Sequence, residues 1–389
     1  MKIRKKEFLE ENVYQASLER IRHIYDSFDE VQVSFSGGKD STAVLNVTLE
    51  VARERNRLPL KVLFFDEEAI HPPTIEYVER VRQSPEIDMD WYCLEIKHRN
   101  ACSNEEPWWY NWEKGKEDIW VRELPENVIT EHPKFKKGMT VPNFVGLTND
   151  KSKGRVAQLT GVRSQESMRR YRIIAMKSEE VYIAGRAEPG TNSYTCHPIY
   201  DWSSEDVWLG VHKFGWDYNK TYDIMNQTKH YQKYLVQRVC PPFGEEPLRG
   251  LWIYAECFPE MWHKMLSRVK GVGTAWRYAN TSLFSRAEKP EGLEWREYIN
   301  VILDSYANPY KNQVKKVMNS VISRHRKRST MKIPEDSAHP ISGVSWKFIC
   351  RVALRGDFKG RVYQMLPDQA KNACDKLGIT QEEAEKQYK

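Results

Sequence analysis

A short polar loop with two glycines is the first part of the sequence whose residue types could do chemistry. It runs from Ser36 to Ser41, reads SGGKDS, and lies between the apolar run Val31 to Phe35 and the helix-forming segment Thr42 to Asn56. A glycine-bearing loop between a strand and a helix presents backbone N–H groups and the positive end of the helix dipole, which together bind phosphate. The loop lacks the GxxxxGK[ST] spacing of P-loop kinases and GTPases, so it is not a loop of that class.

Two arginines follow a later apolar run at close spacing. The segment Gly161 to Arg170 reads GVRSQESMRR and comes directly after Val156 to Gly161. The planar guanidinium groups of Arg163 and Arg170 suit bidentate binding of an oxyanion. The alternative for the arginines alone is the start of a surface helix with solvated charges.

These loops need a scaffold that brings them together, and the pattern of the chain predicts one. Apolar runs typical of strands alternate with segments typical of helices, which predicts an α/β fold with a parallel sheet. Ligands of such sheets bind at the carboxyl ends of the strands, so Asp66 and Glu67, which follow Phe65, join the candidate residues. The expected strands are Val31–Phe35, Lys61–Phe65, Met89–Ile96 and Val156–Gly161, and the expected helices cover residues 5–28, 42–56 and 74–82.

Together these motifs resemble a known family. SGGKDS after an apolar strand is similar to the pyrophosphate-binding loop of the N-type ATP pyrophosphatases, the adenine nucleotide alpha hydrolase-like (HUP-type) superfamily. That superfamily includes the phosphoadenosine phosphosulfate (PAPS) reductases, the small subunit of ATP sulfurylase and tRNA thiolation enzymes. Gly161 to Arg170 resembles the GxRxxES…R segment of the PAPS reductase branch, whose arginines face nucleotide phosphate or sulfate. His197 to Trp208 and Tyr218 to Asp223 resemble the PI…W…DVW and N-x-x-Y-D segments of that branch, and we expect them to close the pocket mainly by packing.

The sequence also departs from the reductases. It has neither a C-terminal ECGxH-type cysteine nor paired cysteines for an iron–sulfur cluster, and its last cysteine, Cys374, lies in NACDKLG. The chain looks closest to an uncharacterised PAPS reductase-like branch with an extra helical C-terminal domain. Members of that branch are often paired with a ParB/sulfiredoxin-like protein, which the resemblance implies as a partner.

The resemblance implies an enzyme that binds ATP with Mg²⁺ and lets an oxyanion substrate attack the α-phosphate, giving an adenylylated product and pyrophosphate. Lys39, Arg163 and Arg170 would neutralise phosphate charge, and Asp40 would help hold Mg²⁺. The residues expected to bind the nucleotide are Ser36, Gly37, Gly38, Lys39, Asp40, Ser41, Asp66, Glu67, Gly161, Arg163, Glu166 and Ser167.

Two other functions remain open. The first alternative is a regulator that senses ATP or a sulfonucleotide and binds nucleic acid or a partner through its C-terminal region. A true PAPS reductase is the third hypothesis, and the missing cysteine motif argues against it. Multiple-turnover release of pyrophosphate separates the enzyme from the regulator.

The organisation of the chain predicts three parts. They are an N-terminal helix within residues 1–29, a nucleotide-binding domain at 30–230 with a tryptophan-rich insertion at 100–150, and a helical, basic region at 231–389. Tryptophans of the insertion either stack on a base or cap the site, or they pack on the sheet edge. Residues 311–328 carry seven Lys/Arg and no acid, which favours either contact with a nucleic-acid backbone or a solvated helix face.

Composition limits the class of protein. Sixty Lys+Arg against 54 Asp+Glu give a net charge of +6 in 389 residues, and no apolar stretch is long enough to span a membrane, so we expect a soluble cytoplasmic protein with no membrane contact. Seven cysteines without a CxxC pair indicate free thiols. Metal ligation by Cys196, His197, Cys240, Cys257 and His263 is a weak alternative, and a catalytic thiol would be Cys196, Cys240 or Cys257.

Overall fold

The computed structural model describes residues 9–149, 154–175, 182–186, 191–228, 239, 243, 247–278, 289–355 and 361–389. The chain forms two compact units, each of which gathers segments far apart in the sequence. Unit 1 comprises Met1–His98, Tyr110–Pro241 and Ile253–Arg268, and unit 2 comprises Arg99–Trp109, Pro242–Trp252 and Val269–Lys389. The domain limits expected from the sequence, 30–230 and 231–389, stay predictions.

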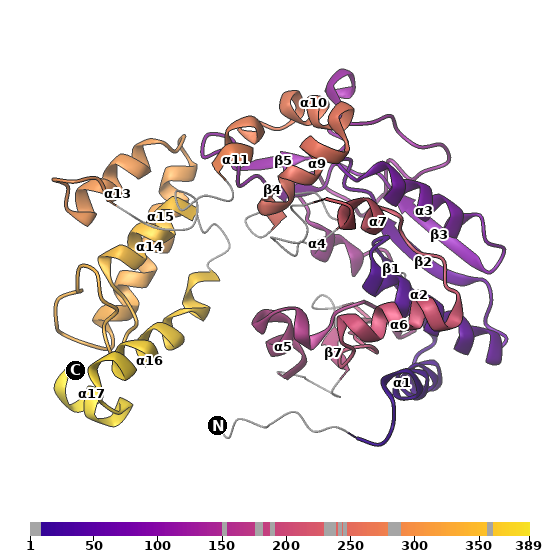
Figure 1. Cartoon of the computed structure of the whole chain (residues 1–389), viewed down its shortest axis with the longest axis horizontal. Helices are drawn as coiled ribbons and strands as arrows, with labels where there is room; N and C mark the ends of the chain where they lie inside the picture. The colour runs from indigo at the N-terminus through magenta and orange to yellow at the C-terminus, as the bar shows by residue number, and fades with distance from the viewer. Residues whose placement is uncertain are drawn as a thin grey trace. The chain divides into compact units, whose positions relative to one another are not determined.

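A six-stranded sheet forms the centre of unit 1 (Figure 1). Its order is β3-β2-β1-β6-β8-β7; the first five strands are parallel, and β7 runs antiparallel to β8. The expected α/β fold with a parallel sheet is therefore confirmed, whereas β7 and β8 were not expected. The strands are β1 (Glu30–Phe35), β2 (Leu60–Phe65), β3 (Ile87–Tyr92), β6 (Val156–Leu159), β7 (Ile183–Arg186) and β8 (Ser193–Cys196).

The direction of chain progress reverses beside β1. The chain adds β2 and β3 on one side of β1 and then returns to place β6 on the other side, so Val33 lies in register with both Val62 and Leu159. In open parallel sheets a crevice forms at the carboxyl ends of the strands where the order reverses. The loops after β1 and β6 meet at that point.

Helices cover this sheet, and three of them begin elsewhere than the sequence indicates. Helix α3 (Pro72–Arg82) begins two residues before its expected start at residue 74. Helix α1 begins at Val13, not near residue 5, because the side chain of Asn12 accepts hydrogen bonds from two first-turn amides and ends the preceding extended chain. Helix α2 begins at Lys39, three residues before the expected start, because Gly38 is its extended N-cap. The four helices nearest the sheet are α1 (Val13–Ser27), α2 (Lys39–Glu54), α3 (Pro72–Arg82) and α6 (Ser204–Phe214), and both α1 and α6 pack on α2.

Shorter elements complete the nucleotide-binding region. They are η1 (Glu117–Ile119), α4 (Val141–Val145), η3 (Ser164–Glu166), α5 (Met168–Ala175), α7 (Thr221–Asn226) and α10 (Pro259–Arg268). Strands β4 (Lys97–Arg99) and β5 (Trp108–Tyr110) form a separate two-stranded sheet, and α9 covers Leu251–Cys257.

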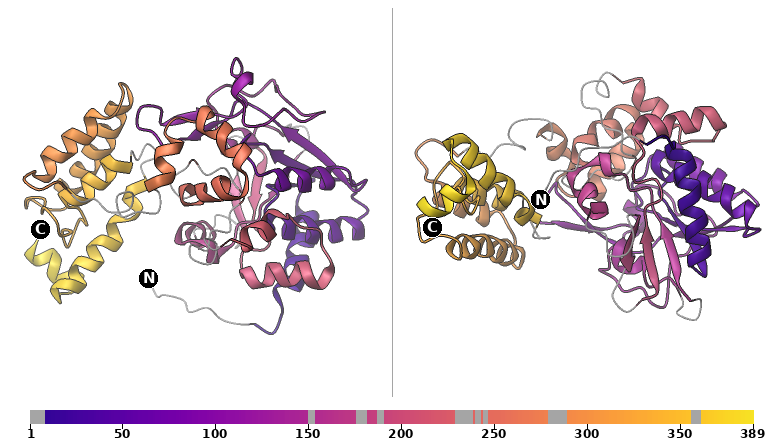
Figure 2. Two further views of the ribbon diagram at one scale, coloured as in Figure 1. Left: turned by 45° about the horizontal axis from the view of Figure 1, so that its top comes forward. Right: turned by 90° about the horizontal axis from the view of Figure 1, so that it is seen from below.

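Unit 2 is helical, as Figure 2 shows for its orange and yellow segments. Helices α13, α14 and α15 enclose one apolar core, in which Val314, Val321 and Ile349 are fully buried. The expected helical C-terminal region is confirmed. Among the described residues no helix is both long and apolar enough to cross a membrane. The elements are η4 (Pro247–Gly250), α11 (Val272–Tyr278), α13 (Trp295–Asp304), α14 (Tyr310–Arg326), α15 (Trp346–Arg355), η5 (Arg361–Gln364), α16 (Leu366–Leu377) and α17 (Gln381–Gln387).

Candidate nucleotide-binding site

Neighbouring side chains hold the glycine loop between β1 and α2. Gly37 has φ +69°, and a Cβ there would lie 2.9 Å from Cγ2 of Thr74, so glycine alone suits the turn. Nδ2 of Asn219 donates to the Gly37 carbonyl and to Thr74 Oγ1, both at 2.8 Å. Gly38 is the N-cap of α2 and, as a glycine, has no side chain that could accept a hydrogen bond from the first turn. The positive end of a 16-residue helix therefore lies at the loop without a side-chain cap.

Two serines and a tyrosine complete the loop. Ser36 and Ser41 share a hydrogen bond between their hydroxyls at 3.1 Å, and the Ser36 amide donates to Ser41 Oγ at 3.2 Å. Ser41 Oγ also donates to the Gly38 carbonyl at 2.9 Å. The Lys39 amide donates to the hydroxyl of Tyr222 at 3.0 Å, which ties the start of α2 to α7.

Lys39, Asp40 and Arg163 form a charged cluster at the start of α2. Lys39 Nζ lies 3.0 and 3.1 Å from the Asp40 oxygens, and Arg163 Nε donates to Asp40 Oδ1 at 2.7 Å. The rest of the Arg163 guanidinium donates to the Trp202 carbonyl and to Ser204 Oγ, both at 3.2 Å. The Lys39 and Arg163 side chains are only 5% and 3% exposed, so two nearly buried cations share one carboxylate. The cluster has a net positive charge, which favours an anionic ligand.

Gly161 allows the loop after β6 to reach α2. A Cβ at this position would lie 2.8 Å from the carbonyl carbon of Asp40 and 2.9 Å from the amide nitrogen of Ser41. Contacts that short do not occur with a real side chain, so the close approach requires glycine. The two loops are thus in direct backbone contact.

Arg170 reaches the cavity from helix α5. Its guanidinium pairs with Glu166, and Glu166 Oε2 also accepts the amide of Arg163 at 3.3 Å. Ser167 Oγ accepts the Arg170 amide at 3.2 Å and does not line the cavity, so Ser167 positions the helix start. The side chain of Arg169 lies outside the described residues.

Asp66 and Glu67 have different environments although they are adjacent. Asp66 is fully buried, accepts from Trp91 Nε1 at 2.9 Å and pairs with Arg122, so the structure does not bring it into the cavity. Glu67 lines the cavity, and its Oε1 lies 3.6 Å from Nδ1 of His98. Burial raises the pKa of Glu67 to about 7, and the negative charge of Asp66 adds to the effect.

His197, the first residue of the segment that the sequence predicted to close the pocket by packing, lies behind the cavity wall. Its Nδ1 is 2.7 Å from Oγ1 of Thr160, which lines the cavity, and its Nε2 has no hydrogen-bond partner among the described residues. Burial lowers the pKa of His197 to about 4, with a smaller effect from the charge of Arg170. The imidazole is therefore neutral at neutral pH and fixes Thr160 without adding charge to the cavity.

A cavity of about 640 Å³ connects these groups. Gly37, Asp66 and Ser167 do not line it, although they were expected in the site. Phe64, Phe65, Ile70, Val141, Pro142 and Val239 supply apolar wall, which suits the base and sugar of a nucleotide. Ten expected residues line the cavity: Ser36, Gly38, Lys39, Asp40, Ser41, Glu67, Gly161, Arg163, Glu166 and Arg170.

No cysteine of the described residues lines this cavity. Cys196 is buried in β8, and Cys257 lies in α9 at a separate surface pocket. Cys240 lies outside the described residues. The described part of the chain holds no group of three or more His, Cys, Asp or Glu side chains arranged to bind a metal ion.

Two tryptophans of the insertion pack inside the protein. Trp112 is 2% exposed, donates from Nε1 to the Asp66 carbonyl at 2.9 Å and meets the ring of Trp120 edge-on at 5.1 Å. Trp112 therefore belongs to the hydrophobic core of unit 1 and is not exposed to stack on a base. A buried ion pair between Glu68 and Arg268 holds the same segment, because Glu68 also accepts the amide of Trp112 at 2.7 Å.

Comparisons with known families and proteins agree with the motifs. The phosphoadenosine phosphosulfate reductase domain matches residues 30–228, and a domain of unknown function, DUF3440, matches residues 233–338. The chain is 31% identical over 384 residues to the uncharacterized protein YbdN of Escherichia coli (strain K12), and the match covers 93% of this chain and 92% of that protein.

Similar solved structures cover about half of the chain. A phosphoadenylyl-sulfate (PAPS) reductase from Candida auris is 15% identical with a TM-score of 0.31, and the match covers 56% of this chain and 93% of that one. An FMN adenylyltransferase from Candida glabrata is 11% identical with a TM-score of 0.35, and the match covers 56% of this chain and 62% of that one.

Proposed function

Because the chain belongs to the family of the phosphoadenosine phosphosulfate reductase domain, we propose that it is an ATP-using enzyme that transfers an adenylyl group and releases pyrophosphate. An oxyanion of the acceptor attacks the α-phosphorus and forms the new P–O bond. The bond from the α-phosphorus to the bridging oxygen breaks, and its electron pair leaves with pyrophosphate. Atoms and charge balance without a redox partner.

The observation that carries this proposal is the cluster of Lys39, Asp40 and Arg163 at the start of α2. Two nearly buried cations and a helix N-terminus favour the β- and γ-phosphates, whose negative charge grows as pyrophosphate leaves. Arg170, held by Glu166, adds a third cation at the cavity wall. We place the adenosine against the apolar wall that includes Phe65 and Pro142.

The donor set of the loop fits Mg²⁺ carried in with ATP. This ion takes oxygen ligands, commonly one or two carboxylates together with substrate phosphates. Asp40 would supply the carboxylate, and the hydroxyls of Ser36 and Ser41 lie on the same loop. Mg²⁺ would neutralise phosphate charge, while Lys39 and Arg163 hold Asp40 in place.

Two observations favour adenylyl transfer over the other functions. The described cavity lining has no cysteine, which a thiol-dependent reductase would need there. Glu67, with a pKa of about 7, lines the same cavity and suits removal of the proton whose loss turns an acceptor hydroxyl into the attacking oxyanion. A regulator that only binds a nucleotide does not need a proton acceptor in its binding site.

Product analysis tests the proposal. The full chain is incubated with MgATP labelled at the α- or the γ-phosphate, alone and with small oxyanions such as sulfate, and labelled pyrophosphate is measured over several turnovers. We expect pyrophosphate and an adenylyl product or AMP, which Lys39→Met abolishes. The matched control is Lys61→Met, because Lys61 lies on β2, pairs with Asp88 and Asp90, and does not line the cavity. Production of ADP and orthophosphate would overturn the proposal, and tight ATP binding without turnover would favour the regulator.

A further inference from the structure

Helix α14 in unit 2 has two unlike faces. Val314, Met318, Val321 and His325 are buried in the core formed with α13 and α15. The opposite face is basic, because the chain has no Asp or Glu between Asp304 and Glu335 but eight Lys and Arg. Seventeen residues give this face a length of about 25 Å.

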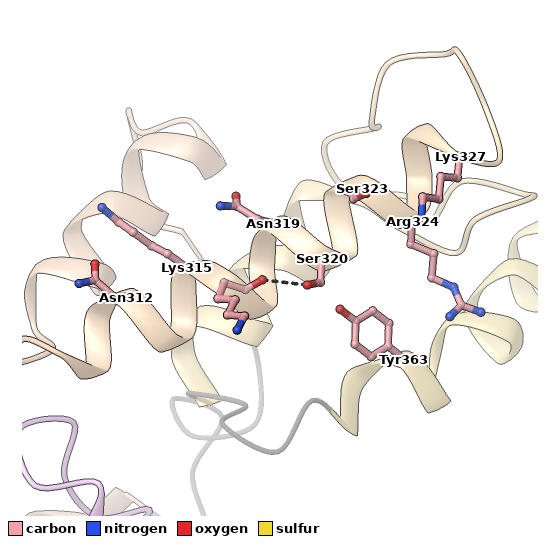
Figure 3. Close-up of a pocket in the computed structure, with 9 residues that line it drawn as sticks. Asn312, Lys315, Asn319, Ser320, Ser323, Arg324, Lys327 and Tyr363 are labelled. Carbon is pink, nitrogen blue, oxygen red and sulfur yellow. Dashed lines mark hydrogen bonds between the residues drawn. The ribbon is translucent and has the colours of Figure 1, made fainter.

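The basic face forms one wall of an open groove of about 730 Å³. Figure 3 shows Lys315, Arg324 and Lys327 along α14, with the ring of Tyr363 rising from η5 beside them. The Arg324 guanidinium lies 5.8 Å from the centroid of that ring. The remaining lining residues are Lys316, Asn312, Asn319, Ser320 and Ser323, and no carboxylate of the described residues lines the groove.

The cations of the groove differ from the basic residues next to them. Lys311 pairs with Asp304, and Arg328 donates to the Ile341 carbonyl at 3.1 Å. In the described part of the chain Lys315, Lys316, Arg324 and Lys327 form no ion pair with a carboxylate. Among the described residues these four positive charges have no ion-paired carboxylate, and they repel each other along one helix face, so an anionic partner lowers the free energy of this surface.

From this groove we infer that unit 2 binds single-stranded nucleic acid along α14. Lys315, Lys316 and Lys327 contact successive phosphates, and Asn and Ser side chains donate hydrogen bonds to the same backbone. One base stacks on Tyr363 beside Arg324. This inference does not depend on adenylyl transfer, because none of its residues lies in unit 1.

The lining favours a single strand over the other polyanions. An acidic peptide would use the lysines but has no base to place against an aromatic ring. A duplex keeps its bases stacked inside, so it offers Tyr363 no exposed ring face. A flexible strand satisfies the cations, the neutral donors and the ring together.

Binding of a labelled oligothymidine, followed by fluorescence anisotropy across roughly 50 to 200 mM salt, tests the inference. The groove variant K315Q/R324Q/K327Q removes three positive charges. The control variant K371Q/K376Q/K386Q removes the same charge from exposed lysines of α16 and α17. Circular dichroism confirms that both remain folded. A third variant, Tyr363→Leu, removes the ring and keeps an apolar side chain on the core.

We expect the full chain and the control variant to bind with log affinity falling by about 0.7 per contacted phosphate for each decade of salt. The groove variant should lose at least roughly tenfold in affinity and show a slope smaller by about 1.4, because Lys315 and Lys327 are two of the phosphate contacts. Tyr363→Leu should weaken binding by roughly 5- to 150-fold with no change in slope. Equal losses in the groove and control variants would overturn the inference. Absence of binding at low salt would also overturn it. Tighter binding of a duplex would overturn it and indicate duplex DNA as the ligand, and equal binding of polyglutamate would overturn it and indicate an acidic protein.

Discussion

Asp40 accepts hydrogen bonds from two nearly buried cations, and this sharing determines what single substitutions reveal. Removing the carboxylate leaves Lys39 and Arg163 as neighbouring unpaired charges, which costs folding stability as well as function. Removing the Lys39 charge leaves a complete pair between Asp40 and Arg163. Lys39 is therefore the cleaner probe of phosphate binding.

Lys39→Met should weaken ATP binding by about 10- to 100-fold, since a charged hydrogen bond contributes roughly 1.5–3 kcal/mol. The methionine keeps the apolar stem, so the melting temperature should change little. Titration calorimetry with MgATP measures the affinity, and Lys61→Met serves as the charge-matched control. An affinity equal to that of the unchanged chain would remove the phosphate role from the loop.

Glu67 predicts a pH dependence of ATP affinity. With its pKa raised to about 7, the carboxyl is neutral at lower pH and gains a negative charge in the cavity as pH rises through 7. The ratio of the affinity of the unchanged chain to that of Glu67→Gln should therefore be near one at about pH 6 and fall up to roughly tenfold by about pH 8. Taking the ratio cancels the titration of ATP itself, and a ratio independent of pH would contradict the assignment.

The same group affects folding with a definite sign. The pKa of Glu67 is higher in the fold than its ordinary value of 4.5, so the unfolded chain loses this proton first as pH rises. Stability relative to Glu67→Gln should fall between about pH 4.5 and 7 and then level off. Urea unfolding at several pH values measures the difference.

At the scale of elements, the site depends on the contact between the loop after β6 and the first turn of α2. At this contact Gly161 leaves no room for a Cβ, and Nε of Arg163 in the same loop donates to Asp40 Oδ1 at 2.7 Å. A methyl group there would push the loop that carries Arg163 away from the helix turn that carries Asp40, and so would separate the two side chains. The packing of these two elements thus sets the distance between the Arg163 guanidinium and the Asp40 carboxylate.

Gly161→Ala should cost about 1–3 kcal/mol of unfolding free energy, the usual range for overpacking, and weaken ATP binding further than that loss explains. Gln165→Ala, an exposed change in the same loop, is the control and should alter neither quantity. Denaturant unfolding and calorimetry measure the two effects separately. If Gly161→Ala kept full stability and full ATP affinity, the close approach of the two loops would not be required for either.

For the whole molecule, we expect no thiol redox chemistry, because the sequence lacks the ECGxH-type cysteine motif of the reductases. Adding thioredoxin and PAPS to the full chain should give no sulfite, with an authentic PAPS reductase as the positive control. Sulfite that disappears in Cys240→Ser would contradict this expectation. It would also identify Cys240, next to the cavity residue Val239, as the missing thiol.

Sequence patterns were informative where chemistry and structure depend on neighbouring residues. SGGKDS after an apolar strand predicted the turn and a helix after it, although not the residue at which the helix begins, and the parallel sheet followed from the alternation of elements. Strand β8 was missed because Ser193–Cys196 is only 4 residues long and reads SYTC, which has no run of aliphatic side chains to indicate a strand. The environments of Trp112 and Tyr222 depend on partners 46 and 183 positions away, which no local pattern encodes.

The anchoring of the glycine loop by Asn219 and Tyr222 has a consequence for dynamics. Because the Lys39 amide already donates to Tyr222 and the Thr42 amide to Gly38, both should exchange slowly with deuterium before any ATP is present. Ordering a loop residue on binding costs roughly 1–2 kcal/mol, and a loop ordered in advance avoids that cost. Hydrogen exchange should therefore change little over Gly37 to Thr42 when ATP is added. Nucleotide affinity at this loop is then governed by charge rather than by induced order.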